Sequence, residues 1–93
     1  MTRYALRTDA NQTAVISALE AAGATVDVIG KPVDLLVGIR GQLMLMEIKN
    51  RARRPSDGKK TPAQVRFFER WAGFPISLVD GPEAALRAIG VMK

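Results

Sequence analysis

The amino-acid sequence predicts a single α/β domain with the element order αβββαβα, in which helices flank a mixed sheet. Helical periodicity recurs in three segments, residues 9–22, 61–72 and 81–90. Short, β-rich apolar runs occupy residues 25–29, 33–39, 42–48 and 75–79. A chain of 93 residues has room for one domain with a modest core, so we assign residues 1–93 to it and expect oligomerisation to add stability.

The first helix is predicted to begin at Thr8 or Asp9 and to end at Gly23, where glycine suits the left-handed position. Its apolar stripe recurs at i, i+3 and i+4 spacing and comprises Ala14, Val15, Ala18, Leu19 and Ala22. A short strand over Thr25–Ile29 follows. The segment Gly30-Lys31-Pro32 then interrupts the chain before the next strand.

The runs 33–39 and 42–48 are predicted to pair as a hairpin around the two-residue turn Arg40-Gly41. In that register Asp34 lies directly opposite Glu47, with Cβ atoms roughly 4.5–5.5 Å apart, and Lys49 shares their face. The remaining residues of both faces are apolar: Val33, Leu35, Val37, Met44, Met46 and Ile48 on one, Leu36, Leu43 and Leu45 on the other. Helices should therefore cover both faces of the sheet.

Two opposed carboxylates at this spacing repel each other, so either one is protonated or a cation lies between them. A hard divalent ion held by Asp34, Glu47 and the backbone carbonyl of Ile48 is the natural candidate. The alternative is a structural ion pair that Lys49 forms with Asp34 or Glu47 at the edge of the sheet. From the residues alone, the two interpretations are equally supported.

Composition narrows the chemistry that is available to the protein. The chain has no cysteine and no histidine, which excludes disulfides, thiolate zinc sites and imidazole bases. Any catalytic metal must have oxygen ligands, which favours Mg²⁺ or Mn²⁺. The net charge of +5 suggests a polyanionic partner such as DNA. No signal peptide or membrane span is visible, so we expect no membrane association and an intracellular, cytoplasmic protein.

The sequence Pro32-Val33-Asp34, the hairpin and then Glu47-Ile48-Lys49 resemble the PD-(D/E)XK nuclease superfamily. The nearest likeness is to the small VRR-NUC and Holliday-junction-resolvase-like nucleases of phages, and it extends over most of the chain, from the helix before Gly23 to Val79-Asp80-Gly81-Pro82. The resemblance implies a restriction-endonuclease-like core in a phage or bacterial host cell. It implies Mg²⁺- or Mn²⁺-dependent hydrolysis of DNA, with Asp34, Glu47, Lys49 and Gln64 as the catalytic residues.

One position departs from the family pattern. The first helix of these nucleases usually supplies a further acid about eleven residues before its terminal glycine, and here that position is Gln12. An amide oxygen is a weaker metal ligand and brings no negative charge. Glu20, Asp9 or a residue of a second subunit are the alternatives that could replace the missing acid.

A basic segment directly follows Lys49. Its cations are Arg51, Arg53, Arg54, Lys59 and Lys60, against the single acid Asp57. Because this segment begins beside the predicted metal site, we expect its cations to bind DNA phosphates; the alternative is a solvated linker.

The segment Thr61-Pro62-Ala63-Gln64 has the form of a capping box at a helix start. Gln64 is therefore either a structural cap or, as the resemblance implies, a residue that faces the active site. Val65, Phe68 and Trp71 are expected to point inward. Stacking of Phe67 and Trp71 on bases is the less favoured alternative to core packing.

The last elements are a strand over 75–79 and a helix that begins after Asp80 or Gly81, with Ala85, Leu86 and Ile89 inward and Gly90 at its end. Three functions remain open: a metal-dependent DNA endonuclease, a non-catalytic nucleic-acid-binding module on the same scaffold, and a subunit that binds an acidic protein. A homodimer would suit the first, because two sites could cut two strands.

Overall fold

The computed structural model of the protein describes residues 10–49 and 61–92. Within them the elements follow the predicted αβββαβα order. They are α1 (Ala10–Ala21), β1 (Thr25–Val28), β2 (Leu35–Ile39), β3 (Gln42–Ile48), α2 (Pro62–Arg70), β4 (Ile76–Val79) and α3 (Pro82–Ala88). The predicted helix cap at Thr8 or Asp9 lies outside the described residues.

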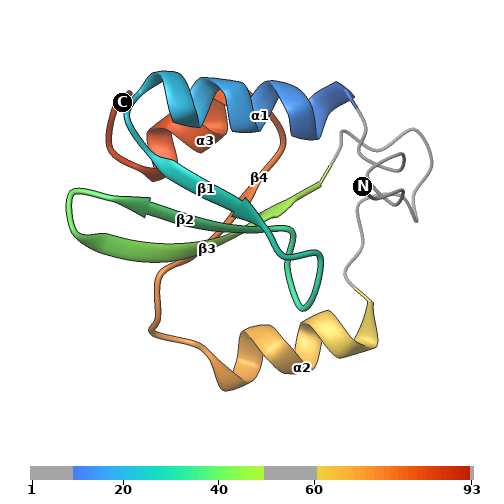
Figure 1. Cartoon of the computed structure of the whole chain (residues 1–93). Coiled ribbons are helices and arrows are strands. Elements are labelled where there is room, and N and C mark those ends of the chain that lie inside the picture. Colours follow the sequence, from blue (N-terminus) through green and yellow to red (C-terminus); the bar gives the residue numbers. More distant parts are fainter. Residues whose placement is uncertain (1–9, 50–60, 93) are drawn as a thin grey trace.

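The four strands form one mixed sheet in the order β1-β2-β3-β4. β2 pairs antiparallel with both β1 and β3, whereas β4 runs parallel to β3. Figure 1 shows α1 and α3 together on one side of this sheet and α2 alone on the other. Because β3 and β4 are parallel, their carboxyl ends lie at the same end of the sheet. Lys49 directly follows β3 at this end.

The predicted register of the hairpin is confirmed. Leu35 pairs with Met46 and Ile39 with Gln42, which leaves Arg40 and Gly41 as a two-residue turn. Both turn residues have positive φ, 53° at Arg40 and 77° at Gly41. Positive φ at both central positions matches the twist of the flanking strands, so the ladder continues without a bulge.

The core lies between the sheet and the pair α1 and α3. Its buried members include Val15, Leu19, Leu35, Val37, Met46, Val79, Ala85 and Ile89. The predicted inward positions Ala85 and Ile89 are confirmed here, with Leu86 half-buried against the same cluster. The expectation that both faces of the hairpin are covered is confirmed only for this face, because Leu43 on the other face is 66 % exposed. Burying one large aliphatic side chain stabilises the fold by about 1.5–3 kcal/mol, so this face holds the domain together.

Several predicted boundaries are wrong by one or two residues. β1 ends at Val28 and β2 begins at Leu35, because the carbonyl of Asp34 accepts hydrogen bonds from Ile29 and Gly30 at 2.9 and 3.2 Å in a loop. β4 begins at Ile76, after a proline that has no N–H to donate to a ladder. The helix α2 ends at Arg70.

The expectation that Val65 and Trp71 point inward is also wrong, because both side chains are exposed. Val65 is turned by about 100° from Gln64, the residue through which α2 contacts the sheet, and so points away from it. Trp71 is the C-cap residue, where the helix ends. No residue of α2 is buried, so this helix covers its face of the sheet loosely.

Candidate metal and catalytic site

Asp34 and Glu47 meet beside the carboxyl end of β3, as the register requires. The backbone N–H of Asp34 donates to Oε1 of Glu47 at 3.2 Å. The backbone N–H of Ile48 donates to Oδ2 of Asp34 at 2.8 Å. Each carboxylate thus accepts a hydrogen bond from the backbone of the segment that carries the other, which holds both side chains on the same face of the hairpin.

Glu47 is buried to an extent that an acid rarely reaches. Its exposed fraction is 5 %, and it is the only polar or charged residue in the buried class within 10–49 and 61–92. Nζ of Lys49 lies 3.4 Å from its Oε2, and the backbone N–H of Lys49 donates to the carbonyl of Val79 at 2.8 Å. Since an unpaired buried charge is strongly destabilising, the carboxylate requires these partners.

Gln64 connects α2 to the two charged residues. Its Nε2 donates to Oε2 of Glu47 at 2.7 Å, and its Oε1 accepts from Nζ of Lys49 at 3.1 Å. The same side chain completes the capping box: Oε1 also accepts from the backbone N–H of Thr61, whose hydroxyl accepts from the N–H of Gln64. The two alternatives predicted for Gln64 are therefore both present in its contacts, as helix cap and as neighbour of the charged pair.

The surroundings of Asp34 raise the pKa of its carboxyl above the ordinary value of 3.8. Burial is the largest cause, and the negative charge of Glu47 acts in the same direction. The hydrogen bond from Ile48 and the positive charge of Lys49 oppose the shift without cancelling it. When ionised, Asp34 and Glu47 carry two negative charges beside the single positive charge of Lys49, and a bound cation would favour the ionised form of the buried Asp34.

The donor atoms fit a hard divalent ion. Asp34 and Glu47 offer carboxylate oxygens, the ligands that Mg²⁺ and Mn²⁺ prefer. The described part of the chain contains no group of three or more acids, histidines or cysteines that could hold a metal ion. A metal here would depend on two carboxylates, completed by oxygens such as the carbonyl of Ile48, which stays a prediction.

Gln12 lies in the first turn of α1 and is half-buried. The neighbouring Asn11 donates from Nδ2 to the carbonyl of Asp80 at 3.0 Å, directly after β4. This end of α1 therefore lies at the edge of the sheet where β3 and β4 end. The sequence patterns did not indicate the bond from Asn11, because its acceptor is a backbone carbonyl 69 residues away. A role for Gln12 as a metal ligand stays a prediction.

The residues predicted to bind DNA phosphates, Arg51, Arg53, Arg54, Lys59 and Lys60, lie outside the described residues. Their weight in the charge balance follows from the sequence alone. Residues 10–49 and 61–92 contain six Lys and Arg against seven Asp and Glu, a net charge of −1. The whole chain has a net charge of +5, so the positive excess of +6 belongs to the other segments.

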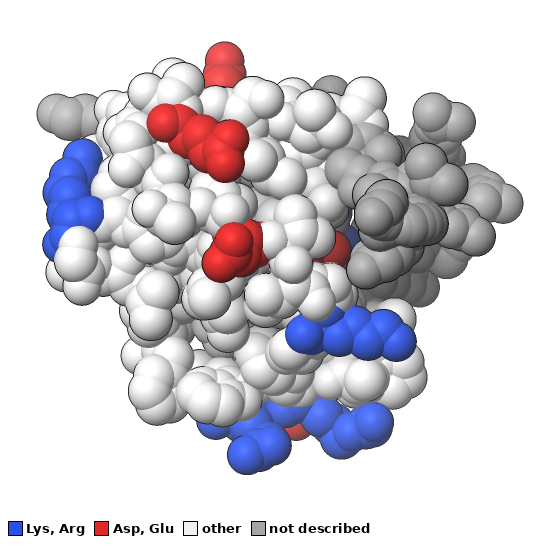
Figure 2. Space-filling model, viewed as in Figure 1, with Lys and Arg blue, Asp and Glu red and all other residues white. Residues whose placement is uncertain are grey.

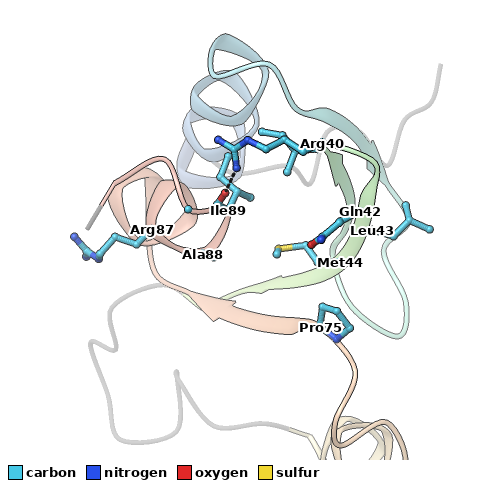
Figure 3. Close-up of a pocket in the computed structure, with 10 residues that line it drawn as sticks. Arg40, Gln42, Leu43, Met44, Pro75, Arg87, Ala88 and Ile89 are labelled. Carbon is cyan, nitrogen blue, oxygen red and sulfur yellow. Dashed lines mark hydrogen bonds between the residues drawn. The ribbon is translucent and has the colours of Figure 1, made fainter.

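A hollow of about 320 Å³ lies at the opposite end of the hairpin, between its turn and α3. In Figure 3, Gln42 and Met44 point into it, Leu43 and Arg87 point away, and Nη1 of Arg40 donates to the carbonyl of Ile89 at 3.1 Å. No acid lines this hollow. The hydrogen bond from Arg40 holds the hairpin turn against the end of α3, so this hollow offers no counterpart to the site at Glu47.

Fold and site together define an α/β domain with a small cluster of carboxylate, amine and amide groups at one end of its sheet. Comparisons with protein-family models, with curated proteins and with solved structures found no match for this chain. The described helices include none that is long and apolar enough to cross a membrane. An assignment of function therefore depends on the chemistry of this cluster.

Proposed function

We propose that this protein is a metal-dependent endonuclease that hydrolyses phosphodiester bonds in DNA, including structured or branched DNA. The observation that supports it most is the convergence of Asp34, Glu47 and Lys49 at the end of β3, with Gln64 bonded to two of them. The element order and the mixed sheet are compatible with a restriction-endonuclease-like core, to which the Asp, Glu-x-Lys pattern belongs by resemblance.

Each residue has a distinct role in this proposal. Asp34 and Glu47 would hold Mg²⁺ or Mn²⁺, and the raised pKa of Asp34 supports a site that favours an added cation. Lys49 places its ammonium beside Glu47, where it would stabilise negative charge that develops on the phosphate. Gln64 fixes the positions of Lys49 and Glu47 through its two amide atoms.

The metal, once bound, would supply an activated water and charge neutralisation at the phosphate. The protein's own residues would then have to orient the scissile phosphodiester bond for attack by the water. A homodimer is part of the proposal, because two copies of one site can cut both strands of a duplex or a junction.

Cleavage of a panel of labelled substrates tests the proposal: linear duplex, nicked duplex, flap, junction and single strand, with Mg²⁺, with Mn²⁺ and with EDTA. We expect metal-dependent cutting that is lost in Asp34→Ala, Glu47→Ala and Lys49→Ala. Asp27→Asn is the matched control, since Asp27 is an exposed acid on the same face of the sheet, opposite Leu36. Cutting that survives in the three variants would refute the assignment of the site.

A second candidate function has one specific observation in its favour. The described residues bring only two carboxylates together at the site, and the expected third acid is replaced by Gln12. This supports a nucleic-acid-binding module that does not cut. Gln12→Glu discriminates between the two, because restoring the acid should raise Mg²⁺ affinity and cutting if the wild type is a weak nuclease. DNA binding without cutting in both proteins, under either metal, would favour the module.

A further inference from the structure

Two rows of side chains run along α2: an exposed arginine row, and an aromatic row that is half-buried at Phe67 and exposed at Trp71. Phe67 and Trp71 are four residues apart and so lie on one line along the helix, as do Arg66 and Arg70. The rows are adjacent, because each arginine immediately precedes an aromatic residue and successive residues are turned by about 100°. Glu69 lies on the far side of the arginine row from the aromatic one.

The aromatic row continues past the end of the helix. Ring centroids of Phe67 and Trp71 are 6.0 Å apart with the planes tilted by 33°, and those of Trp71 and Phe74 are 5.0 Å apart at 60°. Trp71 is 37 % exposed and Phe74 is 59 % exposed, although both are large apolar residues. Connected aromatic surface that remains open to solvent is typical of a binding site rather than of a core.

Charge favours a nucleic acid as the occupant. In Figure 2 the blue atoms of Lys and Arg gather over the lower part of the molecule, where Figure 1 has α2, whereas red atoms lie mainly above it. Arg66 and Arg70 are both exposed. A two-fold dimer centred on the aromatic row would bring these arginines of both copies together, and repulsion would oppose it. A DNA strand instead offers a phosphate for each arginine and a base for each ring.

We propose that the aromatic ledge, defined as Phe67, Trp71 and Phe74, binds unpaired DNA bases by stacking while Arg66 and Arg70 contact the phosphates. Stacking needs a free face of the base, so the ledge discriminates in favour of single-stranded segments over intact duplex. Base stacking on aromatic residues tolerates any sequence, because every base has a π face.

The inference rests on the proposed function for its biological meaning, since the ledge and the candidate catalytic site share one helix. Trp71 follows Gln64 by seven residues, two turns further along α2, so their backbones are about 10 Å apart at 1.5 Å per residue. This is the length of about three stacked bases at 3.4 Å. An unpaired base on Trp71 would therefore lie within about three nucleotides of a phosphate at Glu47.

Trp71 is the only tryptophan in the chain, so intrinsic fluorescence reports on the ledge directly. The full-length wild-type protein is titrated in EDTA with unlabelled oligo(dT) and, separately, with a duplex hairpin of equal length. Anisotropy of labelled DNA measures the dissociation constants in parallel. We expect oligo(dT) to quench Trp71 emission and to bind more tightly than the duplex.

Three variants of the ledge and one control are compared with the wild type. Trp71→Ala and Phe74→Ala should each weaken oligo(dT) binding about tenfold, the effect of losing one stacked base, and Trp71→Phe should retain most of the affinity. Val65→Ala removes an exposed apolar residue from another side of α2 and should leave binding unchanged. Circular dichroism melting of each variant shows whether the fold is retained.

Saturated oligo(dT) binding with unchanged Trp71 emission would overturn the inference while leaving the proposed nuclease function intact. The opposite result also separates the two proposals. Quenching of wild-type emission and weaker binding by Trp71→Ala, without cleavage by the wild type under any metal, would support the ledge and refute the nuclease. A Trp71 emission that changes on dilution of the protein alone would assign the ledge to a second copy of this chain. Quenching by an acidic peptide but not by DNA would assign it to a protein partner, and either result refutes our proposal.

Discussion

The two faces of the sheet differ in how they are covered, although the same strands build both. The face towards α1 and α3 is dry and closely packed, with Leu35, Val37 and Met46 fully buried. The face towards α2 has buried charge at Glu47 and no buried residue in the covering helix. One face therefore supplies stability, and the other retains polar groups and exposed aromatic rings that packing alone does not explain.

The contrast is sharpest at two neighbouring residues of β3. Met46 and Glu47 are both buried but project to opposite faces, since side chains alternate along a strand. Met46 contacts the apolar core, whereas Glu47 has Lys49 and Gln64 as partners. If the faces divide stability from function as we infer, substitutions at these two positions should have opposite effects.

The largest expected effect is on cleavage by Glu47→Gln. Loss of one metal ligand should lower cleavage of the best substrate by about 100-fold or more, equivalent to about 3 kcal/mol of transition-state stabilisation. Glutamine preserves the size of the side chain, so the free energy of unfolding should change little. A variant that unfolds in step with its loss of activity would show that Glu47 is a structural residue instead.

Met46→Ala should have the opposite effect: it should lower stability and largely preserve cleavage activity. Removing a fully buried methionine leaves a cavity and should lower the free energy of unfolding by about 2–5 kcal/mol, measured by urea denaturation. Under conditions in which the variant is folded, its cleavage rate should remain within a few-fold of the wild type. A comparable loss of activity in the folded variant would contradict the division between the two faces.

Gln64→Ala tests the only described side-chain link between α2 and the charged pair. It removes half of the capping box and one partner of buried Glu47, and should destabilise the domain by about 1–3 kcal/mol. Thr61→Ala is the control, because it weakens the same cap without touching Glu47 or Lys49. Hydrogen exchange should rise in α2 for both variants, whereas cleavage should fall markedly only for Gln64→Ala. Equal loss of cleavage in both would show that Gln64 acts only as a cap.

The smallest effect concerns pH and Asp34. Because the pKa of Asp34 is raised in the folded protein, folding takes up a proton between pH 3.8 and the folded value. The contribution of Asp34 to stability is therefore fully present below 3.8 and is lost as pH rises through the folded pKa. Asp34→Asn, whose amide oxygen can still accept from Ile48, should raise the melting temperature at neutral pH without metal and have no such effect at pH 3.

Mg²⁺ provides the control for this prediction. It should raise the melting temperature of the wild type at neutral pH and leave that of Asp34→Asn nearly unchanged, since binding to the folded state alone shifts stability. An equal response of both proteins to Mg²⁺ would indicate that the ion binds elsewhere.

Local sequence rules predicted the hairpin and its register because they depend on neighbours in the chain. A two-residue turn at Arg40-Gly41 dictates which residues pair, and pairing dictates that Asp34 and Glu47 share a face. The capping box at Thr61 was likewise readable from four consecutive residues. These parts of the site needed no knowledge of the remaining fold.

The failures concern contacts between distant segments. Helical periodicity groups Phe67, Phe68 and Trp71 on adjoining faces but does not say how much of that surface the sheet covers, so Trp71 was wrongly expected to be inward. The sequence leaves two alternatives open for Gln64, because the residue to which it bonds, Glu47, is 17 residues away in the chain. Periodicity identifies which residues share a face; only the packed structure shows what lies against it.

The alternation of side chains along β3 has a consequence for recognising this site in other chains. One residue inserted or deleted between Gln42 and Glu47 would rotate the carboxylate and Lys49 towards Val15 and Leu19 and turn Met46 outward. The residues within this stretch can vary in type as long as their number is kept. The number of residues between the acids of the hairpin is therefore a more durable signature of the site than the identity of any residue between them.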